Sequence, residues 1–128
     1  MSIQKDLLYT PDHEWARVEG TEAVFGITHH AQEQLGDIVF VELPGEGDEV
    51  TRGERFGTVE STKAVSDCNA PLSGRVVAVN AALNDDPATI NRDPYNEGWM
   101  IRVELSDASQ ASGLLTPDAY EKLVAESH

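Results

Sequence analysis

The segment Phe56-Gly57-Thr58-Val59-Glu60-Ser61-Thr62-Lys63-Ala64-Val65-Ser66-Asp67 holds two short β-prone runs on either side of one lysine. The residues next to that lysine are small: Ser61, Thr62 and Ala64. Small residues between two β-branched runs predict a tight β-hairpin with Lys63 at its tip. A lysine there is hydrated, flexible and reachable by another protein. A lysine that only keeps an exposed turn from aggregating would look the same in isolation.

The residues around this hairpin extend the pattern in both directions. They are Gly47-Asp48-Glu49-Val50 and Gly53 upstream, and Ala70-Pro71, Ser73-Gly74 and Val76 downstream. With the hairpin they resemble the lipoyl-attachment signature of biotinyl and lipoyl carrier domains. The resemblance implies a mainly β fold, a flattened β-barrel or sandwich of two sheets (a barrel-sandwich hybrid), with the modified lysine on a hairpin. Biotin carriers usually have methionine on both sides of the lysine, so Thr62 and Ala64 favour lipoate.

Length and composition limit the classes of protein. The 128 residues predict a single domain, 1–128, and 40% of them are hydrophobic. The formal net charge of −14 argues against binding to nucleic acid, because phosphates would be repelled. No apolar run is long enough for a membrane span, and the N-terminus lacks a signal-peptide core. We therefore expect a cytoplasmic bacterial monomer, or a mitochondrial matrix protein if a transit peptide has been removed.

The N-terminal part predicts strands and one short helix. Residues 16–19 and 22–27 are expected to form strands joined at Gly20, and Thr28 is expected to cap a helix over 29–35. Residues 37–43 predict a strong strand with Val39 on one side and Phe40 on the other, and with both faces covered.

The C-terminal part predicts two more strands, 75–80 and 99–105, with a helical turn over 88–90 between them. Residues 107–113 are small and polar, which predicts a linker. Thr116 and Pro117 are typical of a helix start, so we expect a final helix at about 116–126. The lipoyl-binding core is then expected at about 22–106.

Motifs outside the lysine segment resemble those of one lipoyl family, the glycine cleavage system H proteins. These motifs are Tyr9-Thr10, His13-Glu14-Trp15, Gly26-Ile27-Thr28, Leu35 to Pro44, Asp93-Pro94-Tyr95 and Gly98-Trp99. The resemblance covers the chain from Tyr9 to the terminal helix. Two positions depart from the usual pattern: Cys68 replaces a larger aliphatic residue, and Thr62 replaces valine.

The resemblance implies a carrier and not an enzyme. Lys63 would hold lipoic acid in amide linkage and would carry the aminomethyl group of glycine. Its partners would be a pyridoxal-phosphate glycine decarboxylase, a tetrahydrofolate-dependent aminomethyltransferase, dihydrolipoamide dehydrogenase and the lipoylating enzymes. Two alternatives stay open: a lipoyl relay or acyl-carrier module of another complex, and an unmodified interaction protein on the same scaffold.

Other residues receive secondary roles. Glu60, Ser61 and Asp67 are expected to help the lipoylating enzyme recognise the hairpin. Glu14 and Asp67 are candidates for sheltering the aminomethyl ammonium, although Glu14 could equally be a solvated residue at a strand end. No metal site is expected, because His29 and His30 are adjacent on a helix and point about 100° apart. The single cysteine, Cys68, is expected to be a small buried hydrophobic residue.

Overall fold

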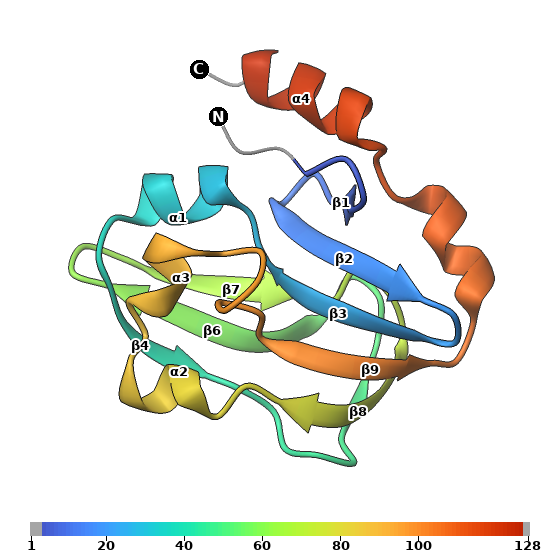
Figure 1. The fold of residues 1–128 in the computed structure, drawn as a ribbon, viewed down its shortest axis with the longest axis horizontal. Coiled ribbons are helices and arrows are strands. Elements are labelled where there is room, and N and C mark those ends of the chain that lie inside the picture. Colours follow the sequence, from blue (N-terminus) through green and yellow to red (C-terminus); the bar gives the residue numbers. More distant parts are fainter. Residues whose placement is uncertain (1–3, 127–128) are drawn as a thin grey trace.

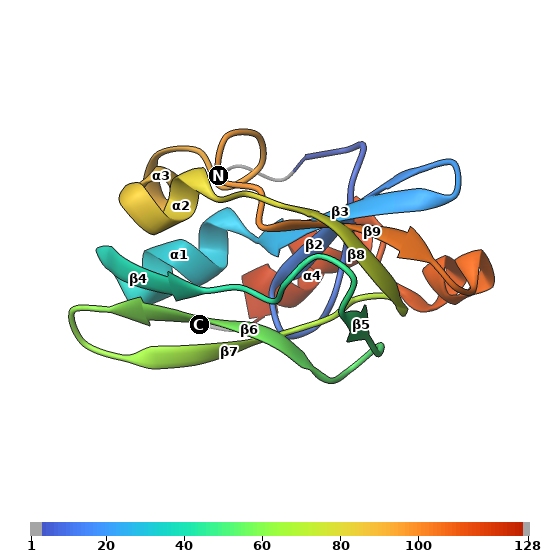
Figure 2. The ribbon, with the colours of Figure 1, turned by 90° about the horizontal axis from the view of Figure 1, so that it is seen from below.

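The computed structural model describes residues 4–126, which form two antiparallel β-sheets with short helices around them (Figures 1 and 2). The larger sheet has six strands in the order β1-β2-β3-β9-β8-β5: Leu8–Tyr9, Glu14–Glu19, Glu22–Ile27, Ile101–Leu105, Gly74–Val79 and Glu49–Val50. The smaller sheet has the order β4-β6-β7: Ile38–Glu42, Arg55–Ser61 and Val65–Asn69. The predicted mainly β sandwich with short helices and a C-terminal helix is confirmed.

The helices lie around the sheets. They are α1 (His29–Leu35), α2 (Ala82–Asp85), α3 (Thr89–Arg92), the 3-10 helix η1 (Ala108–Gly113) and α4 (Pro117–Glu126). As predicted, the Thr28 side chain caps α1, accepting a hydrogen bond from the backbone N–H of Ala31. Within residues 4–126, no helix has the length and apolar character that a membrane crossing requires.

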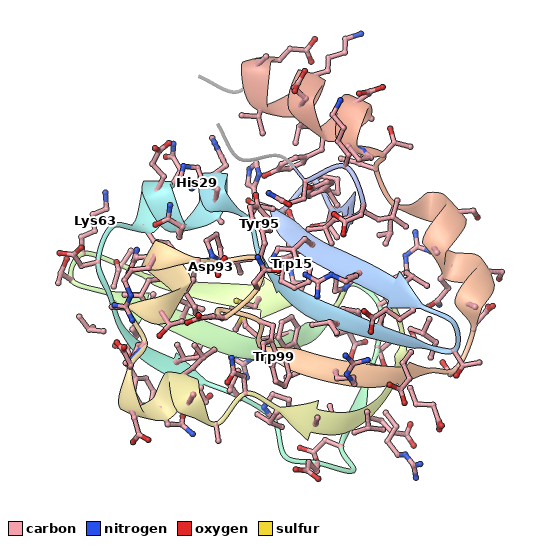
Figure 3. All side chains as sticks on the ribbon, in the orientation of Figure 1. Trp15, His29, Lys63, Asp93, Tyr95 and Trp99 are labelled. Carbon is pink, nitrogen blue, oxygen red and sulfur yellow. The ribbon has the colours of Figure 1, made fainter. Side chains whose placement is uncertain are left out.

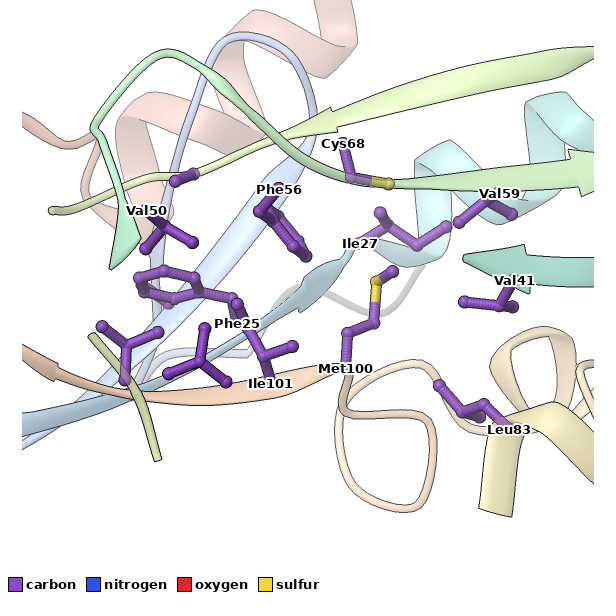
Figure 4. Close-up of a cluster of buried hydrophobic side chains, with 14 of the residues drawn as sticks. Phe25, Ile27, Val41, Val50, Phe56, Val59, Cys68, Leu83, Met100 and Ile101 are labelled. Atoms are coloured by element: carbon purple, nitrogen blue, oxygen red, sulfur yellow. The ribbon is translucent and has the colours of Figure 1, made fainter. Parts of the chain in front are cut away.

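The main core lies between the two sheets (Figure 4). Phe25 of β3 and Phe56 of β6 face each other with ring centroids 6.1 Å apart. Val59 and Cys68 reach the same core from the smaller sheet, so the prediction of Cys68 as a buried hydrophobic residue is confirmed. Burying each large apolar side chain contributes roughly 1.5–3 kcal/mol, so this layer holds the smaller sheet against the larger one.

A second core lies under α4. The rings of Tyr9 and Tyr120 stack with centroids 4.4 Å apart, and the Tyr120 hydroxyl is 2.7 Å from Thr28 Oγ1. Trp15 is fully buried in this cluster, and its Nε1 donates a hydrogen bond to the Pro94 carbonyl at 3.0 Å. The terminal helix is therefore held against the larger sheet through Tyr120.

The expectation that both faces of residues 37–43 are covered is wrong. Ile38 and Val41 are buried, whereas Val39 and Phe40 are 54% and 50% exposed. A register shift between Ile38 and Phe40 in the β4–β6 ladder inserts an extra residue into β4. Such a bulge breaks the simple alternation of side chains, which turns Phe40 outward.

The structure also contains more helical residues than predicted. Residues 108–113 form η1 and not an irregular linker, because the Asp107 side chain accepts a hydrogen bond from the Ser109 N–H and caps this helix. The segment before β9 contains α2 as well as α3, and α3 extends to Arg92, beyond the predicted turn.

Candidate functional site

The β6–β7 hairpin carries Lys63 at one end of the molecule, as predicted (Figures 1 and 2). The last paired residues are Glu60 and Val65, so the tip is short. The Ser61 hydroxyl is buried inside it and accepts hydrogen bonds from the backbone N–H groups of Lys63 at 3.2 Å and Ala64 at 3.1 Å. These bonds pair backbone N–H groups of the turn, while the lysine side chain points outward (Figure 3).

The Lys63 side chain is exposed and lies beside the end of α1 (Figure 3). A Cβ atom on Gly36 would lie 3.7 Å from Lys63 Cε, so the lysine stem runs close to the backbone there. Gly36 has a φ of 82°, which favours glycine and ends the helix. Within residues 4–126, the Lys63 amine makes no hydrogen bond or ion pair. It is therefore available to an incoming reagent.

Asn91 connects α3 to the segment that supports the hairpin tip. Its Nδ2 donates hydrogen bonds to Gln32 Oε1 at 2.9 Å and to the Gly36 carbonyl at 2.8 Å, and its Oδ1 accepts from the Ile38 N–H at 2.9 Å. Between these residues, the Asp37 carbonyl accepts a hydrogen bond from the Thr62 N–H at 3.1 Å. Sequence reasoning missed Asn91, because a single asparagine in a polar segment has no periodic pattern to mark it.

Two predicted recognition residues lie on the strands that lead to and from the tip. Glu60 on β6 is partly exposed and pairs with Phe40 on β4 and with Val65 on β7. Asp67 on β7 is exposed and lies 3.8 Å from the Arg55 guanidinium. An ion pair this exposed contributes little to stability, so the Asp67 carboxylate remains accessible from solvent.

Glu14 is buried, at 2% exposure, and not at a solvated strand end. Its Oε1 accepts a hydrogen bond from the Thr10 hydroxyl, and its Oε2 accepts one from the Asn69 N–H at 3.2 Å. Burial raises the pKa of this carboxyl from 4.5 to about 7, although both hydrogen bonds oppose that change. Glu14 also lines a cavity of about 150 Å³ between the start of β2 and the base of the hairpin, with Pro11 and Arg52 among its other lining residues.

The two sheltering candidates and the lysine are not adjacent. Asn69, which contacts Glu14, ends β7, whereas Lys63 precedes that strand. Asp67 lies on the outer side of the smaller sheet, away from the buried Glu14. An arm on Lys63 would therefore have to fold back along β7 to reach the Glu14 cavity.

Within residues 4–126, two histidine rings lie close together but belong to no metal-binding cluster. His13 and His30 have ring centroids 4.5 Å apart, and His13 Nδ1 is 2.8 Å from the Tyr120 hydroxyl. No group of three His, Cys, Asp or Glu side chains within residues 4–126 has a geometry that could hold a metal ion. Burial raises the pKa of the Cys68 thiol, so this group is not a reactive thiolate.

Comparison with known proteins gives one consistent result. A family model described as "Glycine cleavage H-protein" matches residues 7–127. A glycine cleavage system H protein of Myxococcus xanthus is 54% identical over 126 residues, which are 98% of each chain. Glycine cleavage system H protein 2, mitochondrial, of Arabidopsis thaliana is 52% identical over 97% of this chain and 80% of its own. The crystal structure of a Mycobacterium marinum H protein has a TM-score of 0.89 and 46% identity, covering 96% of this chain and 99% of that chain.

Proposed function

Because the chain belongs to the glycine cleavage H-protein family, we propose that Lys63 carries its lipoic acid in amide linkage. Members of this family are lipoate-carrying subunits of the glycine cleavage system, so the protein is a carrier and not itself a catalyst. The relatives reported above give no support to a lipoyl relay or to an acyl-carrier module of another complex. The single observation that carries the Lys63 assignment is its exposed amine on a hydrogen-bonded hairpin tip at one end of the molecule.

The residues around Lys63 fit a covalently attached arm. The exposed amine can lose a proton and form an amide bond with the carboxyl carbon of an activated lipoyl group, while the activating group leaves. Gly36 leaves room beside the lysine stem, and Ser61 holds the tip in place. The bound lipoate would supply the redox-active disulfide that accepts and releases the aminomethyl cargo. The chain supplies reach and recognition, which raise the local concentration of the cofactor near its targets.

Family membership implies partners in general terms, and we propose the specific enzymes. Membership of the glycine cleavage system implies the enzymes of that system. We propose specifically the pyridoxal-phosphate glycine decarboxylase, the tetrahydrofolate-dependent aminomethyltransferase, dihydrolipoamide dehydrogenase and the lipoylating enzymes. We also propose that the protein acts as a monomer. A cytoplasmic location stays a prediction that the bacterial relatives support, whereas the Arabidopsis relative is named as mitochondrial.

The lysine assignment is tested by intact and tryptic mass spectrometry on protein from cells supplied with lipoate. We expect one lipoyl group, on the peptide that contains Lys63, and none on Lys63→Arg, which keeps the charge but changes the acylated amine. Lipoate on Lys5 or Lys122 would contradict the assignment. Glycine-dependent carbon dioxide exchange with the decarboxylase should require the lipoylated wild type.

We propose that Glu60 and Asp67 contribute to recognition of the hairpin, and that Ser61 contributes by holding its shape. The exposed Asp67 and the partly exposed Glu60 support direct contact with a partner, whereas the buried Ser61 hydroxyl supports an indirect role. Glu60→Gln or Asp67→Asn should slow lipoylation without loss of stability. Equal lipoylation rates in both variants and in wild type would reject this role.

We propose Glu14 as the acceptor that shelters the aminomethyl ammonium between partners, with Asp67 as the second candidate. The buried carboxyl beside a cavity supports Glu14, because a partly desolvated carboxylate binds an ammonium strongly. Glu14→Ala should speed the release of ammonia and formaldehyde from the loaded, isolated carrier. Its lipoylation and its reoxidation by the dehydrogenase should not change. Release rates equal to those of wild type would exclude the sheltering role.

A further inference from the structure

Three of the four large apolar side chains that are exposed within the described residues lie in the smaller sheet that carries the Lys63 hairpin. They are Val39, Phe40 and Val65, at 54%, 50% and 64% exposure. The fourth, Val18, is 37% exposed and lies on β2 in the other sheet. Exposed apolar residues scattered singly need no explanation, but a group beside a functional lysine does.

The strand register places Phe40 and Val65 on the same face. Phe40 pairs with Glu60, and Glu60 pairs with Val65, so the three side chains form one row across the sheet. The next row along the same strands is Glu42, Thr58 and Asp67. We call Phe40, Val65, Glu42, Glu60 and Asp67 the outer hairpin face.

This face combines an apolar pair with three carboxylates. Arg55 lies 3.8 Å from Asp67 at the edge of this face. Val41 and Val59 on the opposite side of the sheet fill the core, so Phe40 is not needed there. The bulge in β4 instead directs Phe40 to solvent. Both β4 and β7 are edge strands, where exposed apolar side chains favour association with another protein.

Resting on the proposed acylation of Lys63, we propose that the outer hairpin face docks the enzyme that attaches lipoate. The matching surface on that enzyme has an apolar centre and a rim of Lys and Arg side chains. Complementary charge supports this pairing, because the face carries three carboxylates and the chain has a net charge of −14.

The length of the lysine side chain indicates that the acylating enzyme, and not an enzyme that uses the finished arm, contacts the outer hairpin face. Before acylation, the amine lies no further than one lysine side chain from the hairpin backbone. The acylating enzyme must therefore bring its active site against the hairpin and will contact the strands next to it. The enzymes that use the finished arm meet it only after the acyl chain has extended it. They can therefore reach the cargo with less contact to this face.

The test measures KM and kcat for the unmodified chain with a purified lipoate–protein ligase, lipoate and ATP, followed by intact mass. The variants are Phe40→Ser, Val65→Thr and their combination, with Val18→Thr as the matched control on the other sheet. All three positions are exposed, so the variants should keep wild-type unfolding midpoints. We expect the double variant to raise KM about tenfold, as loss of a central apolar contact does, with kcat within about twofold. Val18→Thr should leave both constants unchanged.

The possible results separate this inference from the proposed function. Lipoylated wild type together with an unchanged KM in the double variant would overturn the docking face and leave Lys63 as the modified residue. Wild type that takes up no lipoate would overturn the Lys63 assignment and the docking face with it. If the lipoylated double variant lost turnover with the glycine decarboxylase by the same factor, assignment to the acylating enzyme would be wrong. A wild-type dimer that the double variant converts to monomers, with KM unchanged, would assign the face to a second copy of the chain.

Discussion

Replacing Glu14 by glutamine should remove a large part of the pH dependence of folding stability. Glutamine has the shape of the protonated carboxyl. Its Oε1 can accept the Asn69 N–H, and its Nε2 can donate to Thr10 Oγ1, so both hydrogen bonds of the wild type have a counterpart. The substitution therefore removes the titration of Glu14 and keeps one hydrogen bond to each of the two wild-type partners.

The magnitude follows from the pKa of this carboxyl, which burial raises from 4.5 to about 7. Between these values the folded protein holds a proton that the unfolded chain has released, so the free energy of unfolding falls as the pH rises. The contribution is fully present below pH 4.5 and is lost as the pH passes 7. Each pKa unit corresponds to about 1.4 kcal/mol, so the loss is up to about 3 kcal/mol. The glutamine variant should not show it.

The assay is urea unfolding between pH 5 and pH 8.5, followed by tryptophan fluorescence, because Trp15 is fully buried. Relative to wild type, the unfolding free energy of Glu14→Gln should rise by about 1–3 kcal/mol from pH 5 to pH 8. Burial lowers the pKa of His13, which acts in the opposite direction below pH 6.5, but this effect is common to both proteins and cancels in the difference. Glu54→Gln, which changes an exposed carboxylate, is the control and should give a flat difference.

Parallel curves for wild type and Glu14→Gln across this pH range would refute the reasoning. They would mean that the two hydrogen bonds to Glu14 balance the effect of its burial. A confirmed difference would have a consequence for the proposed shelter. Near neutral pH the free carrier would hold Glu14 partly protonated, and an ammonium group brought next to it would favour the ionised form. Retention of the cargo should then improve as the pH rises through 7.

Three further predictions concern packing, support of the hairpin and partner binding. Gly26→Ala would place its Cβ 2.6 Å from the Trp15 ring, so it should lower the unfolding free energy by about 1–3 kcal/mol. The control is Gly45→Ala, whose Cβ would come no closer than 3.6 Å to Asp48, an ordinary contact that should not lower stability. Urea midpoints measure both, and equal midpoints would contradict the close contact at Gly26. Asn91→Leu removes the three hydrogen bonds described above and should cost about 1–3 kcal/mol. It should also speed amide hydrogen exchange at Thr62, and unchanged exchange there would show that Asn91 does not support the tip. Glycine decarboxylation with this carrier should slow as salt rises, because exposed charges are screened within about 8 Å at physiological ionic strength, and a flat response would indicate apolar docking instead.

The local parts of this molecule could be predicted from its sequence. Small residues between β-branched runs determine the Lys63 hairpin, and Thr28 and Gly36 determine the ends of α1, because turn and cap preferences act over a few residues. The net charge and the composition likewise belong to the chain whatever its fold. The Lys63 hairpin could therefore be predicted before any tertiary contact was known.

Only the tertiary structure decided what surrounds that lysine. The outward position of Phe40 depends on a bulge against β6, the raised pKa of Glu14 depends on burial beside Asn69, and the support of the tip depends on Asn91. All three features depend on contacts between residues that lie 20 or more positions apart along the chain. Burial and strand register arise from such distant contacts, and neither periodicity nor propensity within a short window contains them.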